Sequence, residues 1–243
     1  MAYLLHIDTS GDAGCVALAL DGKLLCHAEN TEPRNHAASI NVMIDDVLAR
    51  AGIKFKDLAG VAVCAGPGSY TGLRISMATA KGLCYALDIP LLLENKLTLL
   101  AHQAYTKYQK KFAYYIPVLL AREKEYFISV FNSDFDNIFP AKHITENDME
   151  AVFAEKNDIC IISEQFNDEN HQKYSKNAYV ESETKIDLEN WLFYTFEQYE
   201  CNNTVNLSTA EPFYLKQVYT HKWLIIKHKS IVQILFTHTL TMN

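Results

Sequence analysis

Apolar residues recur along this chain in two patterns, which divide its first 108 residues into short strands and amphipathic helices. Runs of alternating or continuous apolar residues indicate strands, and apolar positions three and four apart indicate helices. Asp21-Gly22 lies between two strand-like runs and predicts a tight hairpin. The expected strands are residues 3–8, 15–20, 23–29, 60–64 and 89–93, and the expected helices are residues 35–51, 71–87 and 96–108.

This order of elements, β-β-β-α-β-α-β-α, predicts a ribonuclease-H-like unit. A three-stranded meander starts the sheet, and crossover helices then extend it with parallel strands. Residues 1–108 are therefore expected to form one α/β subdomain.

The pattern of apolar and polar residues changes after residue 108. Strands are expected at residues 114–120, 126–131 and 159–163, and a helix at residues 188–199. Residues 109–222 are predicted to form a second subdomain. An atypical apolar tail follows at residues 223–243, and its sequence suggests no function.

A glycine-rich turn joins the strand at residues 60–64 to the helix that follows it. Gly66 and Gly68 permit close backbone approach, and Ser69 can cap the helix. Free N–H groups at the start of a helix favour an anion. Two interpretations stay open, a phosphate cradle and a tight turn packed against another chain. All nine glycines lie at or before Gly82, so no second glycine-rich nucleotide loop is expected.

Composition narrows the classes of function. The net charge of −7 argues against direct nucleic-acid binding, and the hydrophobic content of 49% indicates a folded chain. The six cysteines show no paired spacing, which favours reduced, buried thiols in a cytosolic protein and no metal site. We read neither a signal peptide nor an apolar run able to span a bilayer. A cytoplasmic protein that does not contact membranes is expected.

Four segments carry a resemblance to a known family. They are Ile7-Asp8-Thr9-Ser10, the run GPGSYTGLRI at residues 66–75, AREKEY at residues 121–126, and EPFYLK at residues 211–216. With these segments the chain resembles the TsaB (YeaZ) family over residues 4–216. The resemblance implies two ribonuclease-H-like subdomains of the superfamily that includes actin, Hsp70 and sugar kinases.

The resemblance also implies a role in threonylcarbamoylation of adenosine 37 in tRNAs that read codons beginning with A. A TsaB-like chain is expected to be a non-catalytic scaffold without a cofactor. It would form a heterodimer with a TsaD-like catalytic subunit and be engaged by a TsaE-like ATPase. Contact with tRNA is expected only through that complex, and a homodimer of the isolated chain stays open.

The position of a metal motif in catalytic relatives supports the non-catalytic interpretation. Those relatives carry two histidines four residues apart after the strand that follows the glycine-loop helix. The matching positions here are Lys96 and Leu100. Two imidazoles on one helix face can share a metal, whereas a lysine and a leucine cannot. No catalytic residue and no metal ligand is therefore expected.

Alternative functions depend on the first strand and the glycine loop. Asp8 and Ser10 lie where an actin-like ATPase has phosphate-loop residues, so a vestigial nucleotide site of Asp8, Ser10, Gly66, Gly68 and Ser69 is one interpretation. The favoured interpretation is that Asp8 ends its strand and bonds its own turn. An active actin-like ATPase or small-molecule kinase remains the alternative function. A metallopeptidase is less favoured, because no HExxH is present.

The two helices at residues 35–51 and 71–87 are the expected partner surface. The second helix has apolar or small residues on both sides, which is typical of a helix that is sandwiched or pairs with a partner. The family resemblance implies a four-helix contact. The expected contact residues are His36, Ile40, Met43, Ile75, Ala78, Thr79, Gly82 and Ala86.

Overall fold

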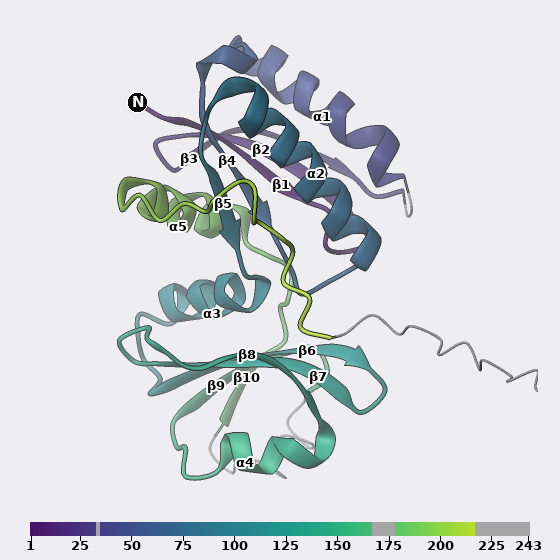
Figure 1. Cartoon of the computed structure of the whole chain (residues 1–243). Helices are drawn as coiled ribbons and strands as arrows, with labels where there is room; N and C mark the ends of the chain where they lie inside the picture. Colours follow the sequence, from purple (N-terminus) through teal and green to yellow (C-terminus); the bar gives the residue numbers. More distant parts are fainter. Residues whose placement is uncertain (33–34, 167–177, 217–243) are drawn as a thin grey trace, which may run out of the picture.

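A computed structural model describes residues 1–32, 35–166 and 178–216. The predicted apolar tail at residues 223–243 lies outside the described residues. In the described part the chain forms two five-stranded sheets, stacked with helices between and outside them (Figure 1).

The first sheet has the predicted elements with small shifts of their ends. Its strands are β1 (Tyr3–Asp8), β2 (Gly14–Leu20), β3 (Lys23–Asn30), β4 (Leu58–Cys64) and β5 (Leu91–Glu94). The helices of this half are α1 (His36–Ala51), α2 (Tyr70–Leu87) and α3 (Lys96–Lys107), with a 3-10 turn at Phe55–Asp57. The strand order is β3-β2-β1-β4-β5, antiparallel within the meander and parallel from β1 to β4 and β5.

The second sheet repeats that topology. Its strands are β6 (Tyr114–Arg122), β7 (Glu125–Asn132), β8 (Asn137–Thr145), β9 (Ile159–Ile162) and β10 (Ala178–Glu181). The helices are α4 (Met149–Phe153) and α5 (Leu188–Glu200), with a 3-10 turn at Glu146–Asp148. The order β8-β7-β6-β9-β10 matches the first sheet strand for strand. The predicted α/β fold of two ribonuclease-H-like subdomains is confirmed.

Side-chain caps fix where the helices begin. The Ser69 side chain accepts a hydrogen bond from the Gly72 N–H at the start of α2, and Asn95 does the same for the Leu97 N–H at the start of α3. Asp187 caps α5 through the Asn190 N–H. Each cap therefore marks the point at which a loop ends and its helix begins.

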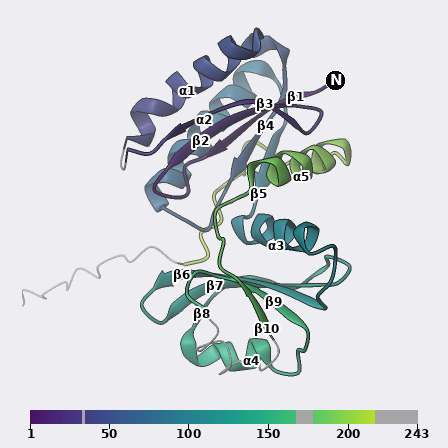
Figure 2. The same ribbon diagram turned by 180° about the vertical axis from the view of Figure 1, so that it is seen from behind.

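The last helix of each half packs on the sheet of the other half. α1 and α2 cover one face of the first sheet, whereas α5, which follows the second sheet in sequence, covers the other face. α3 follows the first sheet in sequence but packs on the second sheet, whose far face is covered by α4. Figure 2 shows α3 and α5 as the middle layer between the sheets. The domain boundary predicted at residue 108 falls between α3 and β6, and it stays a prediction.

Small residues on the first sheet let α5 approach closely. Ala17 and Ala19 on β2 pack against Leu192, and Cys64 on β4 packs against Trp191. Leu5 of β1 and its neighbours on the other face contact α1 and α2. Because successive residues of a strand point to opposite faces of the sheet, one set packs on α1 and α2 and the other set packs on α5.

Three elements differ from the sequence prediction. β8, α4 and β10 were not expected. β8 is an edge strand that contains Pro140 and has only Ile144 buried, so its apolar alternation is weak. α4 and β10 span only five and four residues, which is too short for a periodic signal.

Candidate functional site

A cleft of about 1240 Å³ lies between the first sheet and the segment that joins β10 to α5. It is lined by residues after β1, by side chains of β3 and α3, and by residues 183–191. In a fold of two stacked α/β units this is where a ligand would be expected, at the carboxyl end of β1. The cleft is therefore the first candidate site.

Of the five residues in the predicted nucleotide site, the structure brings only Asp8 to the cleft. Ser10, Gly66, Gly68 and Ser69 do not line it. The Asp8 carboxylate accepts a hydrogen bond from the Ser10 N–H at 2.7 Å. This is the turn-closing role that the sequence favoured for Asp8.

The glycine loop packs against the turn after β1. The Ser69 N–H donates to the Ser10 carbonyl at 2.7 Å, and the Thr9 hydroxyl donates to the Gly72 carbonyl at 2.6 Å. A Cβ added at Gly68 would press into the Ser10 carbonyl, and one added at Gly72 would press into the Thr9 carbonyl. The glycines are thus required by contact with another segment of this same chain, which favours a tight turn over a phosphate cradle, and packing of the turn against a second chain stays a prediction.

Carboxylates dominate the lining of the cleft. Among its described lining residues seven are acidic and three are lysines. The acidic residues are Asp8, Asp12, Glu29, Glu164, Glu183, Asp187 and Glu189, and the lysines are Lys96, Lys107 and Lys185. A triphosphate would meet net repulsion here unless cations came with it.

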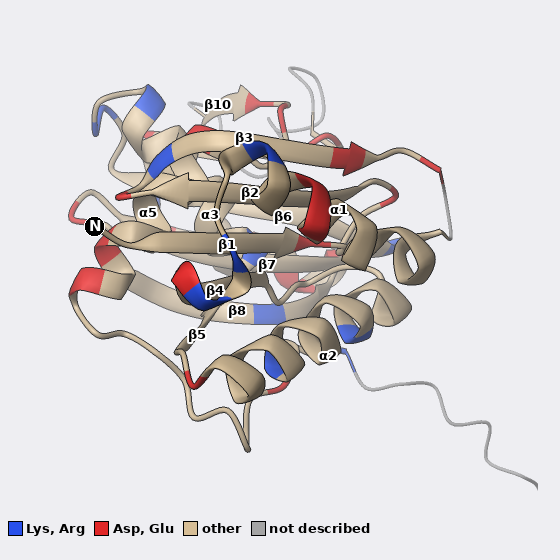
Figure 3. Ribbon diagram, turned by 90° about the horizontal axis from the view of Figure 1, so that it is seen from above, with Lys and Arg blue, Asp and Glu red and all other residues tan. Residues whose placement is uncertain are grey.

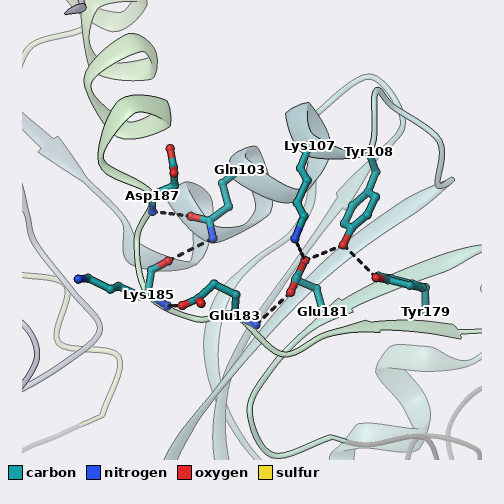
Figure 4. Close-up of polar contacts among 8 residues, drawn as sticks. All are labelled: Gln103, Lys107, Tyr108, Tyr179, Glu181, Glu183, Lys185 and Asp187. Carbon is teal, nitrogen blue, oxygen red and sulfur yellow. Dashed lines mark hydrogen bonds and ion pairs between the residues drawn. The ribbon is translucent and has the colours of Figure 1, made fainter. Parts of the chain in front are cut away.

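A network of polar contacts holds the segment between β10 and α5 against α3 (Figure 4). Gln103 of α3 bonds both sides of this segment, donating to the Lys185 carbonyl at 3.2 Å and accepting from the Asp187 N–H at 2.9 Å. Lys185 also reaches Glu29 of β3 at 3.4 Å. These contacts tie residues 182–187, which we call the strap, to both halves.

Glu181 anchors the start of the strap. It is buried, forms an ion pair with Lys107, and accepts a hydrogen bond from the Tyr108 hydroxyl at 2.6 Å. The same hydroxyl lies 3.1 Å from that of Tyr179. Burial opposes ionisation of Glu181, but the bonds from Lys107 and Tyr108 leave its pKa below the ordinary value. This network could not be predicted from the sequence, because Glu181 lies more than 70 residues from Lys107 and Tyr108 along the chain.

The two positions that match the histidines of catalytic relatives diverge in the structure. Lys96 lines the cleft at the start of α3, whereas Leu100 is fully buried under the second sheet. Within the described residues no group of three or more His, Cys, Asp or Glu is placed to hold a metal ion. Of the two matching side chains, Lys96 offers one amine as a possible metal ligand and Leu100 offers none.

The predicted partner residues fall into three groups, which are buried, half-buried and exposed. Ile40 and Met43 of α1 are buried in the first hydrophobic core, with Ile40 only 1% exposed, and His36 is buried at the start of the same helix. Ile75 and Thr79 of α2 are half-buried, whereas the others are exposed. The exposed members are Ala78, Gly82 and Ala86.

The exposed side of α2 is sparsely charged. Figure 3 shows α1 and α2 side by side on the first sheet. The sequence of α2 contains two basic residues and no acidic residue. A Cβ added at Gly82 would meet no atom within 4 Å, and Tyr85 beside it is 83% exposed. A second helix can therefore approach the α2 backbone at Gly82.

Among the described residues no helix is long and apolar enough to cross a membrane.

Comparison with known proteins gives a consistent set of relatives. The family model described as TsaD, tRNA N6-adenosine threonylcarbamoyltransferase, matches residues 26–165, which is more than half of the chain. A protein of Haemophilus influenzae named tRNA threonylcarbamoyladenosine biosynthesis protein TsaB is 34% identical over 146 residues, covering 58% of this chain and 61% of that protein. Its namesake in Escherichia coli K12 is 36% identical over 104 residues, covering 43% and 45%.

The structural comparison extends further along the chain. The solved structure of YeaZ from Pseudomonas aeruginosa is similar with a TM-score of 0.70 at 23% identity, covering 90% of this chain and all of that one. At this identity the likeness concerns the fold alone. In the sequence comparisons the chain matches about half to three-fifths of the length of these curated relatives.

Proposed function

This chain belongs to the family that the TsaD model describes and, within it, to the TsaB (YeaZ) group, and from this premise we propose that it is a non-catalytic scaffold subunit in tRNA threonylcarbamoyladenosine biosynthesis. In this role it forms a heterodimer with a TsaD-like catalytic subunit. The assembly modifies adenosine 37 of tRNAs that read codons beginning with A. The chain contacts tRNA through that complex, and a TsaE-like ATPase engages the complex as well.

The packing of the glycine loop carries this proposal. A catalytic member of an ATPase-like fold needs backbone N–H groups free to bind phosphate. Here the Ser69 N–H is already bonded to the Ser10 carbonyl, and the Gly72 N–H is bonded to the Ser69 side chain. Two of the N–H donors of this loop therefore serve the fold. This supports a scaffold over an enzyme.

The exposed face of α2 supports the heterodimer. A specific interface buries about 1,200–2,000 Å² in total, and α1 and α2 together, with 16 and 18 residues, offer a face of that order. Small residues at Ala78, Gly82 and Ala86 permit a short distance between helix axes. The proposed contact lies at these exposed residues and at the edges of Ile75 and Thr79. His36, Ile40 and Met43 contribute by holding α1 in place.

Replacing Gly82 tests the heterodimer directly. Gly82→Trp adds a large side chain where the folded chain has open space, so the isolated chain should remain folded and its melting temperature should change little. The same side chain would separate the two subunits, and co-purification with a TsaD-like subunit should be lost. The exposed Phe193→Trp on α5 is the matched control, and it should leave co-purification unchanged.

An active ATPase or small-molecule kinase is the second candidate, favoured by the cleft with Asp8 at its floor. Isothermal titration calorimetry of the isolated chain with ATP and magnesium separates the two. Tight binding together with turnover would support the enzyme. Heat within the buffer control is expected, because the cleft is acidic and the Ser69 and Gly72 N–H groups are already bonded within the chain.

A further inference from the structure

Three exposed side chains from two distant segments meet at the start of α2. Tyr70 and Arg74 come from its first two turns, and Tyr214 comes from a segment 140 residues after Arg74. The Arg74 Nε–H donates to the Tyr214 hydroxyl at 3.1 Å, and the guanidinium carbon lies 4.2 Å from the centre of the Tyr70 ring. The two tyrosine rings are 5.2 Å apart. We call these three residues the Tyr70–Arg74–Tyr214 platform.

The backbone under the platform is held in place on both sides. The Ser69 cap and the bond from the Ser69 N–H to the Ser10 carbonyl fix the start of α2. On the other side the Phe213 N–H donates to the Ala65 carbonyl at 2.9 Å, and Lys216 forms an ion pair with Glu125 of the second half. The platform is therefore a fixed feature of the surface.

Within the described residues Arg74 is held by two tyrosines and has no acidic partner at ion-pair distance. A guanidinium has five N–H donors, and in the described part of the chain only the Nε–H of Arg74 is used. The hydrogen bond to Tyr214, and the negative charge of Glu211 at longer range, raise the pKa of Arg74, yet no described carboxylate lies within ion-pair distance. The outer edge, with both Nη groups, is the part that binds a carboxylate through two parallel hydrogen bonds.

We propose that the Tyr70–Arg74–Tyr214 platform binds an aspartate or glutamate side chain of the protein partner that packs on α2. This inference rests on the proposed function. The side chain of Arg74 is already restrained by both tyrosines, so little rotamer entropy is lost when a carboxylate binds. Tyrosine and arginine are also the residue types that contribute most to protein interfaces.

The position of the platform connects it to the proposed helix contact. Tyr70, Arg74, Ala78, Gly82 and Ala86 follow one another at intervals of four and are all exposed. Residues at this spacing form a continuous ridge on a helix. A helix that lies on the small residues at the far end of this ridge therefore reaches Arg74 at the near end. A nucleic-acid phosphate is a poorer fit, because the chain carries a net charge of −7.

The experiment measures binding of a purified TsaD-like subunit to the full chain by calorimetry, at low and at high salt. Arg74→Gln should weaken binding about tenfold or more at low salt and reduce its salt dependence. Tyr214→Phe keeps the ring but removes the hydroxyl that holds Nε, so a smaller loss of about two- to fivefold is expected. Lys111→Gln removes one exposed charge from the second half and should bind as the wild type does.

The outcomes separate this inference from the proposed function. If the wild type does not bind the TsaD-like subunit, both are overturned. If the wild type binds and Gly82→Trp abolishes binding, but Arg74→Gln binds as tightly as the wild type, only the platform assignment is wrong. If Arg74→Gln instead lowers the affinity of the chain for tRNA and leaves subunit binding intact, the platform is a phosphate site and the inference is also overturned. Unchanged melting temperatures of the variants show that folding is not the cause.

Discussion

At the scale of single residues, the glycines show how one residue type serves opposite purposes. Gly68 and Gly72 are glycines because backbone carbonyl oxygens of the neighbouring turn occupy the space a Cβ would need. Gly82 faces open space, so the folded chain itself does not require a glycine there. A glycine inside a helix lowers helix stability by about 1 kcal/mol relative to alanine. A glycine at position 82 is therefore consistent with a partner that approaches the helix backbone closely.

Paired alanine substitutions test this distinction. Gly72→Ala should lower the free energy of unfolding by about 2–4 kcal/mol, because the added methyl group overlaps the Thr9 carbonyl. Gly82→Ala should raise it by about 1 kcal/mol through helix propensity. Urea denaturation followed by circular dichroism measures both. A Gly72→Ala protein as stable as the wild type would contradict the packing described for the loop.

Glu94 gives a prediction that depends on pH. It is 5% exposed at the end of β5, and burial raises its pKa to about 7. The folded state then holds the proton more firmly than the unfolded state, so this contribution to stability is fully present below pH 4.5 and is lost as the pH rises through 7. Glu94→Gln should therefore raise the free energy of unfolding at pH 8 by up to about 3 kcal/mol.

The same substitution should bring no gain at pH 4, where Glu94 is protonated in both states. The exposed Glu150→Gln is the control, and it should leave the pH profile of stability unchanged. Chemical denaturation at pH 4, 6 and 8 provides the profile. A gain for Glu94→Gln that is equal at pH 4 and pH 8 would contradict a buried carboxyl at this position.

At the scale of elements, the strap is the clearest case of a segment defined by contacts across the fold. Glu181, at the end of β10, is linked to Lys107 and Tyr108 at the end of α3. The pKa of this carboxyl is lowered, so its contribution to stability is present above the ordinary pKa and is lost as the pH falls. The strap should therefore loosen in acid.

Removal of this carboxylate tests the role of the strap. Glu181→Gln should lower the free energy of unfolding by about 1–2 kcal/mol at pH 7 and by much less at pH 3. Hydrogen exchange at residues 182–187 should become faster in the variant. Glu183→Gln is the matched control, because Glu183 is exposed and accepts only a backbone N–H in the described network. Equal exchange in both variants would show that Glu181 does not anchor the strap.

The sequence predicted elements well where the apolar pattern was local and long enough. β1 was predicted with its observed bounds, and α2 began one residue earlier than expected. β8 was missed because Pro140 and its edge position weaken the alternation. The contact partners of the glycine loop could not be predicted, since Gly72 meets a carbonyl 63 residues away.

At the scale of the whole molecule, α3 and α5 join the two halves of the chain. Each of these helices packs on the sheet of the other half, and the strap is bonded to α3 and to β3. The exposed faces of α1 and α2, with the platform at the start of α2, are among those available to a partner in the described part of the chain. The architecture thus favours a subunit that acts through its surface.

Reconstitution of tRNA modification tests that view most directly. Modified adenosine is measured in reactions that contain the threonylcarbamoyl donor and tRNA with this chain alone, with a TsaD-like subunit alone, and with both. A scaffold predicts product at full yield only when both proteins are present, and none with this chain alone. Product formed by this chain without the TsaD-like subunit, or full yield from the TsaD-like subunit without this chain, would contradict the account.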